Sequence, residues 1–188
     1  MKVKPPPDRR KFANEWDQIE YLYDKLLYWL YQREDAAKAR PYADRLERLL
    51  SKADPKQEAI LGQECRSLVY ETKGDLPKAI KHRENEICLI RRLHELSRNA
   101  RHEHAALIDY GFDDLSDRLD LLATLYHAAG QLDKAIATLK ESKRLCEKEG
   151  IAFDGEDLMR ESREEKGSSV DRRVAAHRTC LDNGASGT

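Results

Sequence analysis

A short basic segment holds the side chains whose types most directly suggest chemistry. Its cationic residues are Arg91, Arg92, His94, Arg98, Arg101, His102 and His104. Arginine favours phosphate because its planar guanidinium pairs with two oxygens at once, so the segment is a candidate contact for RNA. A solvated helix end explains the same charges, and a formal net charge of −1 does not favour a nucleic-acid-binding protein. Nucleic-acid binding through residues 91–104 therefore stays as the alternative hypothesis.

Neither a metal centre nor an active site is indicated by the sequence. His102 and His104 are two positions apart, which on a helix directs them to different sides. No pair of cysteines lies close enough in the chain to complete a zinc site. Glycine-rich phosphate loops and the H-E-x-x-H and G-x-S-x-G motifs do not occur. We expect a protein with no cofactor, no metal and no enzymatic activity.

The cysteines and the apolar runs indicate the compartment. Four cysteines are widely spaced, as is typical of reduced thiols in a cytoplasmic protein; they are Cys65, Cys88, Cys146 and Cys180. The first residues lack the apolar segment of a secretion signal. Nowhere do about 18 apolar residues run together, as a membrane-spanning helix needs. We expect a cytoplasmic protein with no membrane contact.

Composition and periodicity predict an all-α fold with about six main helices. Charged residues make up 37% and apolar residues 40%, a balance typical of helices with one buried stripe. Only 9 glycines and 6 prolines are present, which leaves little turn chemistry for an all-β fold. Apolar residues recur at helical steps in three hairpins, at about 14–51, 55–98 and 114–149.

The hairpins divide the chain into three parts. Residues 1–13 are expected to form a flexible, proline-rich arm, and residues 14–153 a helical domain. The charged tail, residues 154–188, is expected to be largely disordered, with a short charged helix as an option near its start. Within the first hairpin we expect the second helix to begin near Pro41, because proline is tolerated in a first turn.

Two stretches of the chain match each other without a gap. The first carries Ser67, Tyr70, Gly74, Leu76 and Ala79. The second carries Ala123, Tyr126, Gly130, Leu132 and Ala135 at the same spacing. The small residue and the alanine allow close approach of two helices, and the tyrosine fills the wedge between them. The glycine can take the left-handed conformation that ends the first helix, so the match predicts two helix–turn–helix hairpins.

These residues resemble the tetratricopeptide repeat family, whose hairpins show a small residue, an aromatic, a turn glycine and an alanine in this order. The resemblance implies antiparallel helical hairpins stacked as a short superhelix. The segment 16–50 looks like a third, degenerate hairpin whose turn has Glu34 and no glycine. The turn glycines are 56 positions apart, more than the family's period of about 34. Arg83 and Glu86 also depart from the family's apolar pattern, so we expect irregular stacking there.

The resemblance also implies a partner-binding groove lined by the first helix of each hairpin. The lining positions map to Leu61, Glu64, Leu68, Glu71, Asp117, Asp120, Thr124 and His127. Such a groove is acidic with some apolar floor, and favours a basic or amphipathic peptide. Ordinary solvated charges on the helices are the competing interpretation.

The N-terminal hairpin is unusually aromatic, with eight of the 13 aromatic residues before Ser51. Five of them lie so close together that they cannot all point to one side of a helix. We weigh a surface around Tyr21, Tyr28 and Trp29, for a partner or for self-association, against plain internal packing. The sequence as a whole predicts a non-catalytic interaction scaffold, whose partner is another protein or peptide.

Overall fold

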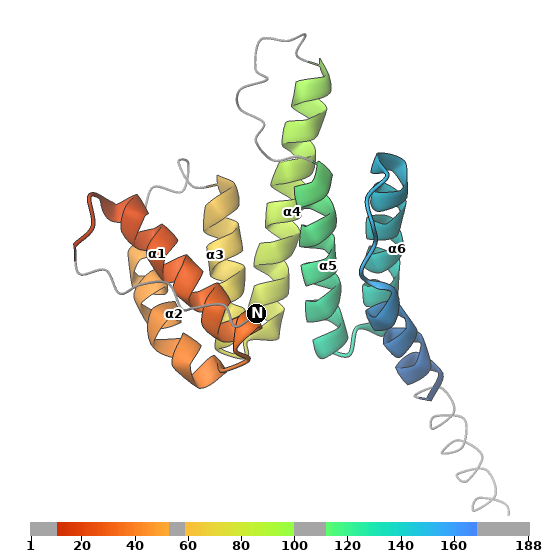
Figure 1. Ribbon diagram of the computed structural model, residues 1–188, viewed down its shortest axis with the longest axis horizontal. Helices are drawn as coiled ribbons and strands as arrows, with labels where there is room; N and C mark the ends of the chain where they lie inside the picture. The colour runs from red at the N-terminus through yellow and green to blue at the C-terminus, as the bar shows by residue number, and fades with distance from the viewer. Residues whose placement is uncertain (1–10, 53–58, 100–111, 169–188) are drawn as a thin grey trace, which may run out of the picture. The chain divides into compact units, whose positions relative to one another are not determined.

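The computed structural model describes residues 11–52, 59–99 and 112–168, and this part of the chain is helical and contains no β-strand (Figure 1). The prediction of an all-α fold is confirmed. Residues 1–10 of the expected arm, most of the unclear segment 98–113, and residues 169–188 of the expected tail lie outside the described residues. The chain divides between Tyr110 and Gly111 into two compact units.

Unit 1 holds two antiparallel hairpins in which each helix packs on the next one (Figure 1). Its elements are α1 (Glu15–Leu27), the π-helical turn η1 (Tyr28–Gln32), α2 (Ala36–Leu50), α3 (Ala59–Thr72) and α4 (Leu76–Asn99). Their shared core is formed by aliphatic residues of α1, α2 and α3, of which Leu22, Leu26 and Leu46 are fully buried. The apolar stripes recognised in the sequence therefore face one another.

The start of α2 differs from the sequence prediction. The helix begins at Ala36, five residues before Pro41, because the Asp35 carboxylate accepts a hydrogen bond from the Lys38 N–H at 3.0 Å. This cap satisfies one of the free N–H groups at the helix start. Pro41 is the sixth residue of the helix, where its missing N–H removes a single backbone hydrogen bond.

The second and third hairpins turn the corner in the same way. Gly74 and Gly130 have φ values of +76° and +68°, the left-handed conformation expected from the sequence. Just after them, the Asp75 N–H donates to the Tyr70 carbonyl at 2.9 Å, and the Gln131 N–H donates to the Tyr126 carbonyl at 2.8 Å. Both glycine corners are therefore confirmed.

The first hairpin has the same corner with a glutamate in it. Glu34 takes the left-handed conformation with φ of +50°, and the Asp35 N–H donates to the Trp29 carbonyl at 2.8 Å. This bond spans one residue more than its counterparts, because η1 inserts an i→i+5 turn in which the Arg33 N–H donates to the Tyr28 carbonyl at 3.0 Å. The corner is preserved and the extra residue is absorbed before it.

A lysine above an aromatic ring recurs at all three corners. Lys38 lies over Trp29, Lys78 over Tyr70 and Lys134 over Tyr126, with 4.9, 5.0 and 5.1 Å from Nζ to the ring centroid. The next residue in each case is an alanine with no exposed surface; these are Ala39, Ala79 and Ala135. A cation–π contact at a surface site contributes about 0.5–1 kcal/mol, so each corner is held by the same modest interaction.

The buried stripe of the second helices differs between hairpins. At two equivalent positions after the corner, α2 has Ala43 and Leu46, whereas α4 has Arg83 and Glu86. Arg83 and Glu86 are buried, at 1% and 0% exposure, and form an ion pair of 2.6 Å. The departure from the apolar pattern noted in the sequence is thus a buried ion pair inside unit 1.

Unit 2 consists of the hairpin of α5 (Phe112–Ala128) and α6 (Leu132–Glu149), followed by a further helix over residues 156–168. The short charged helix that the sequence left as an option near the start of the tail is thus present, and it extends to residue 168. The physical reason is Met159, which is 3% exposed and packs with Ala123 and Leu139. The helix runs antiparallel to α6, since Glu156 pairs with Lys143 and Lys166 pairs with Asp133.

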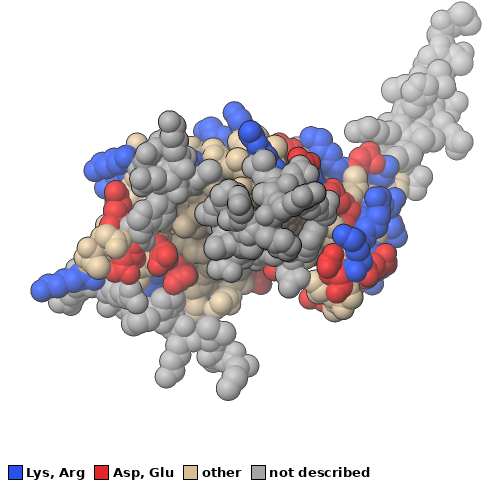
Figure 2. All heavy atoms as spheres, turned by 90° about the horizontal axis from the view of Figure 1, so that it is seen from above, with Lys and Arg blue, Asp and Glu red and all other residues tan. Residues whose placement is uncertain are grey.

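The surface carries both signs of charge. On the face that Figure 2 draws, Lys and Arg side chains are interspersed with Asp and Glu side chains, in keeping with the formal net charge of −1. Within the described ranges no helix has the length and apolar content needed to cross a bilayer.

Of the described cysteines, Cys65 and Cys146 are buried, Cys88 is exposed, and none forms a disulfide.

Candidate partner-binding face

Two tyrosines of the first hairpin are hydrogen-bonded to two glutamates of the second. The Tyr23 hydroxyl donates to Glu64, and the Tyr31 hydroxyl donates to the Glu71 Oε2 at 2.7 Å. We name these four residues the tyrosine–carboxylate face. Tyr23 lies on α1, Tyr31 on η1, and both glutamates lie on α3, so the face joins the first helices of the two hairpins of unit 1.

The π-turn explains why both tyrosines reach this face. Tyr23 and Tyr31 are eight residues apart, which in a regular α-helix leaves them about 80° apart around the axis. The wider turn of η1 takes up one residue and returns Tyr31 to the side of Tyr23. Glu64 and Glu71 are seven residues apart on a regular helix, so they already share a side.

The two hydrogen-bonded pairs differ in exposure. Glu64 is 4% exposed and its partner Tyr23 is half-buried, so this pair lies within the fold. Tyr31 is 38% exposed and is one of the two exposed large hydrophobic residues in the described part of the chain, while Glu71 is half-buried. The Tyr31–Glu71 pair is therefore the part of the face that a partner can contact.

Partial removal from water changes the titration of this outer pair. Burial raises the pKa of the Glu71 carboxyl, although the hydrogen bond from Tyr31 and the positive charge of Arg83 act in the opposite direction. Burial of the hydroxyl end, and then the Glu71 charge, raise the pKa of Tyr31, so the phenol stays protonated and remains a donor. A carboxylate that is partly desolvated gains from an added cation more than a fully hydrated one does.

A buried cation also acts on the outer pair. The Arg83 guanidinium forms its ion pair with Glu86 at 2.6 Å. Its positive charge reaches both Tyr31 and Glu71 and partly offsets the effect of burial on their pKa values.

The groove positions predicted in unit 1 separate into two kinds. Glu64 and Glu71 lie on the tyrosine–carboxylate face, as described above. Leu68 is 1% exposed inside the core, and Leu61 is partly buried against the same core. The groove role expected for Leu68 is wrong, because α3 turns this side chain toward α1 and α2.

In unit 2 the predicted groove positions lie along α5. Asp117 and Thr124 are exposed, whereas Asp120 and His127 are half-buried. The His127 Nε2 lies 3.5 Å from the carboxylate of Glu165 on the helix of residues 156–168. Burial raises the pKa of Asp120, with nearby Asp117 and Asp154 adding to the effect. This side of α5 is thus partly occupied by the chain itself.

The aromatic residues singled out from the sequence are mainly packed inside. Tyr21 and Tyr28 are 9% and 6% exposed, the Tyr21 ring contacts Phe12, and the Tyr28 ring contacts Trp29 edge-on. Trp29 is half-buried beneath Lys38. Of the two interpretations weighed from the sequence, internal packing describes Tyr21 and Tyr28, because both rings are buried within the first hairpin.

Only part of the basic segment is described. Arg91 and Arg92 are exposed on α4 and His94 is half-buried, whereas residues 100–111, with His102 and His104, lie outside the described residues. In the described ranges no group of three or more histidine, cysteine or acidic side chains is arranged to hold a metal ion. The structure brings together no set of phosphate-binding residues in the described part of this segment.

Tyr23, Tyr31 and Arg83 are the site residues that the sequence reasoning missed. The signal for the tyrosines was present, since the Lys-Ala pair of the two glycine corners recurs as Lys38-Ala39. Aligning on that pair places Glu34 at the glycine position and Tyr31 at the position of Glu71. Arg83 was recognised only as a departure from the apolar pattern.

The chain was compared with known protein families, curated proteins and solved structures. No protein-family model, no curated protein and no solved structure matches the chain.

Proposed function

We propose that this protein is a non-catalytic interaction scaffold of the tetratricopeptide repeat type, which acts in the cytoplasm by binding a basic segment of a partner protein. The observation that carries the proposal is the exposed Tyr31–Glu71 pair on the side where the first helices of two stacked hairpins meet. Three equivalent corners, each followed by a buried alanine (Ala39, Ala79 and Ala135), support the repeat interpretation.

The chemistry of the pair suits a lysine or arginine side chain. The Glu71 carboxylate can accept a charge-assisted hydrogen bond, which is about twice as strong as a neutral one. The exposed ring of Tyr31 can receive the same cation over its face, a contact worth about 0.5–1 kcal/mol at a surface site. Both groups are positioned before binding by their mutual hydrogen bond, so little side-chain entropy remains to be lost.

The test is a fluorescence anisotropy titration of the full chain with a short labelled peptide of lysine and leucine. Glu71→Gln is expected to weaken binding about tenfold, which corresponds to about 1.4 kcal/mol. Tyr31→Phe keeps the ring and is expected to retain most of the affinity, whereas Tyr31→Ala loses the cation–π contact as well. Glu95→Gln, which removes an exposed carboxylate near the end of α4, is the matched control.

Two outcomes count against the proposal. Equal binding by wild type and Glu71→Gln contradicts the role of the face. Preferential binding of a labelled single-stranded RNA, with an affinity that falls steeply as salt rises and depends on Arg91 and Arg92, establishes the nucleic-acid alternative instead.

A further inference from the structure

A cleft of about 550 Å³ opens on a different side of unit 1, between the last two turns of α2 and the middle of α3. Its floor is formed by Leu50 and Val69, which are 3% and 1% exposed. Arg66 and Tyr70 line it from α3, on a side of that helix different from the one that carries Glu64 and Glu71. The cleft is therefore separate from the tyrosine–carboxylate face.

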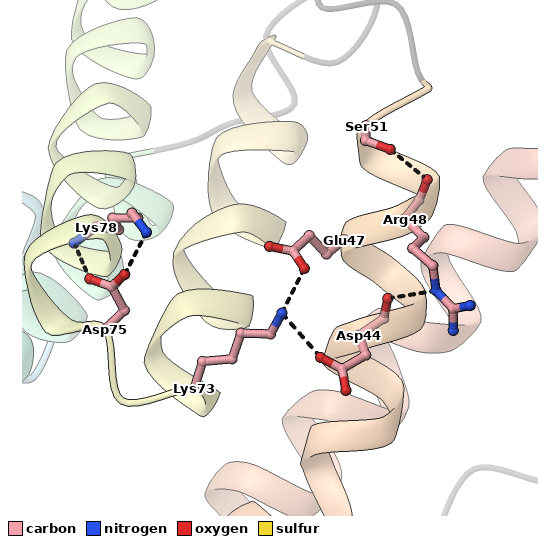
Figure 3. A network of polar contacts seen from close by, with 7 residues as sticks. All are labelled: Asp44, Glu47, Arg48, Ser51, Lys73, Asp75 and Lys78. Carbon is pink, nitrogen blue, oxygen red and sulfur yellow. Dashed lines mark hydrogen bonds and ion pairs between the residues drawn. The ribbon is translucent and has the colours of Figure 1, made fainter.

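The carboxylates beside this cleft are already paired. Figure 3 shows that the Lys73 ammonium lies between two acidic residues of α2, at 2.6 Å from Glu47 and 3.0 Å from Asp44. The hydrogen bond that Lys73 donates to Glu47 is the largest cause that raises the pKa of Lys73, so the lysine stays charged. In the same view Lys78 pairs with Asp75 at 2.7 Å.

The arginines of the cleft, in contrast, are bonded to backbone carbonyls within the described residues. The Arg66 Nη2 donates to the Leu50 carbonyl at 3.1 Å, and the Arg48 Nε donates to the Asp44 carbonyl at 3.1 Å (Figure 3 for Arg48). Among the residues that the structure describes, neither guanidinium has a carboxylate within ion-pair distance. Each guanidinium has five N–H donors, so most remain available to a ligand.

The ring of Tyr70 completes an apolar wall next to these charges. It is stacked on His82, with 5.4 Å between centroids and 7° between planes, and Lys78 lies 5.0 Å from its centroid. His82 is in turn held by Gln63 at 2.8 Å. The wall is thus fixed in place before any ligand arrives, which lowers the entropic cost of binding.

We propose that this cleft binds an acidic, amphipathic segment of a partner protein. A carboxylate of the partner pairs with Arg66 or Arg48, and an adjacent aliphatic side chain covers Leu50 and Val69. The assignment rests on charge complementarity: Glu47, the acidic residue that lines the cleft, is paired with Lys73, whereas Arg66 and Arg48 have no carboxylate partner among the described residues. Unit 1 then carries two recognition surfaces of opposite charge preference.

The experiment is an NMR titration of the ¹⁵N-labelled full chain with a short peptide of glutamate and leucine, and with its twin of lysine and leucine. The acidic peptide is expected to shift the amide signals of Arg66, Val69 and Tyr70. Arg66→Glu is expected to weaken its binding about tenfold, whereas Arg45→Glu, the same charge change elsewhere on α2, leaves it unchanged. The lysine twin is expected to shift signals next to Glu71 and to leave that of Arg66 in place.

A second variant guards against a folding defect in Arg66→Glu, since this arginine bonds to the end of α2. Arg48→Glu changes an exposed side chain, and is expected to weaken acidic-peptide binding while the lysine peptide binds as before. The proposal is overturned if the acidic peptide shifts other signals, or if both arginine variants bind it like wild type. It is also overturned if sedimentation shows a dimer that Arg48→Glu abolishes, because a second copy then fills the cleft.

Discussion

The first corner and the two glycine corners reach the same geometry from different sequences. Gly74 and Gly130 follow regular α-helical turns, whereas Glu34 follows a π-turn that contains one additional residue. The lysine over the ring, the buried alanine and the bond that closes the corner are nevertheless present in each. An inserted residue in a helix is thus accommodated locally, and its main consequence is that Tyr31 is directed at Glu71.

The largest contrast between hairpins is the buried ion pair of α4, which α6 replaces with Leu139 and Ser142. Glu86→Ala is expected to destabilise unit 1 by about 3–5 kcal/mol, because Arg83 is left charged in the core. The double variant Arg83→Leu, Glu86→Ser copies α6 and is expected to be close to neutral. Hydrogen exchange of the α3 and α4 amides measures the stability of unit 1 in both variants. A larger loss of stability in the double variant than in Glu86→Ala contradicts this account.

The glycine corners are expected to tolerate a side chain poorly. Gly74→Ala and Gly130→Ala place a Cβ in the left-handed conformation, which costs about 1–2 kcal/mol at each corner. No neighbouring atom lies within 4 Å of either added Cβ, so the cost comes from the backbone alone. Urea unfolding followed by circular dichroism measures the loss, and an unchanged midpoint for either variant rules the strain out.

Removing the extra residue tests the role of the π-turn. Deletion of Gln32 is expected to convert η1 into a regular turn and to rotate Tyr31 by about 80° away from Glu71. The lysine–leucine peptide is then expected to bind about tenfold more weakly, the value expected for Glu71→Gln. Far-UV circular dichroism and the melting temperature serve as the folding control. If the deletion variant folds and binds the peptide as tightly as wild type, the π-turn is not needed for binding.

The opposite substitution at the first corner is expected to stabilise it. Glu34→Gly removes the strain of a left-handed glutamate, while the greater freedom of glycine in the unfolded chain offsets part of that gain. The net stabilisation is expected to be about 0.5–1 kcal/mol. The measurement is again the urea midpoint, and destabilisation shows that the Glu34 side chain contributes something that its backbone conformation does not explain.

The smallest expected effect is a loss of stability at low pH. Lys38 and Lys78 lower the pKa values of Asp35 and Asp75 below the usual range, chiefly through side-chain hydrogen bonds. A carboxyl whose folded pKa is lowered stabilises the fold above its unfolded pKa, and that contribution is lost as pH falls through the folded pKa. The third corner has Gln131, so NMR titration should find the effect at two corners, and Gln131→Asp should add the third.

The fold was predictable from the sequence where a structural role can be filled by few residue types. Gly74 and Gly130 mark the corners because few other residues adopt a left-handed backbone cheaply, and both were recognised. The first corner was harder to predict, because a one-residue insertion shifts every residue before Glu34 out of alignment with its counterpart. Spacing alone does not show whether a helix will absorb such an insertion or turn differently.

The candidate site was predicted only in part, for a packing reason. Of the positions proposed to line a groove, Glu64 and Glu71 are bonded to Tyr23 and Tyr31, whereas Leu68 faces the core. Which side of a helix is buried depends on where its neighbours lie, and only the structure places α1 and α2 against Leu68. The length of the helix at 156–168 was harder to predict because its buried stripe is short, with Met159 and Ser162 as its buried side chains.

The antiparallel course of that last helix determines where residue 168 lies within unit 2. Because Lys166 pairs with Asp133, residue 168 lies near the start of α6, beside the corner at Gly130, and not near the far end of the hairpin. A fluorescent dye attached at residue 168 would therefore sit close to that corner. Anything that loosens the Lys166–Asp133 end would change the environment of such a dye first.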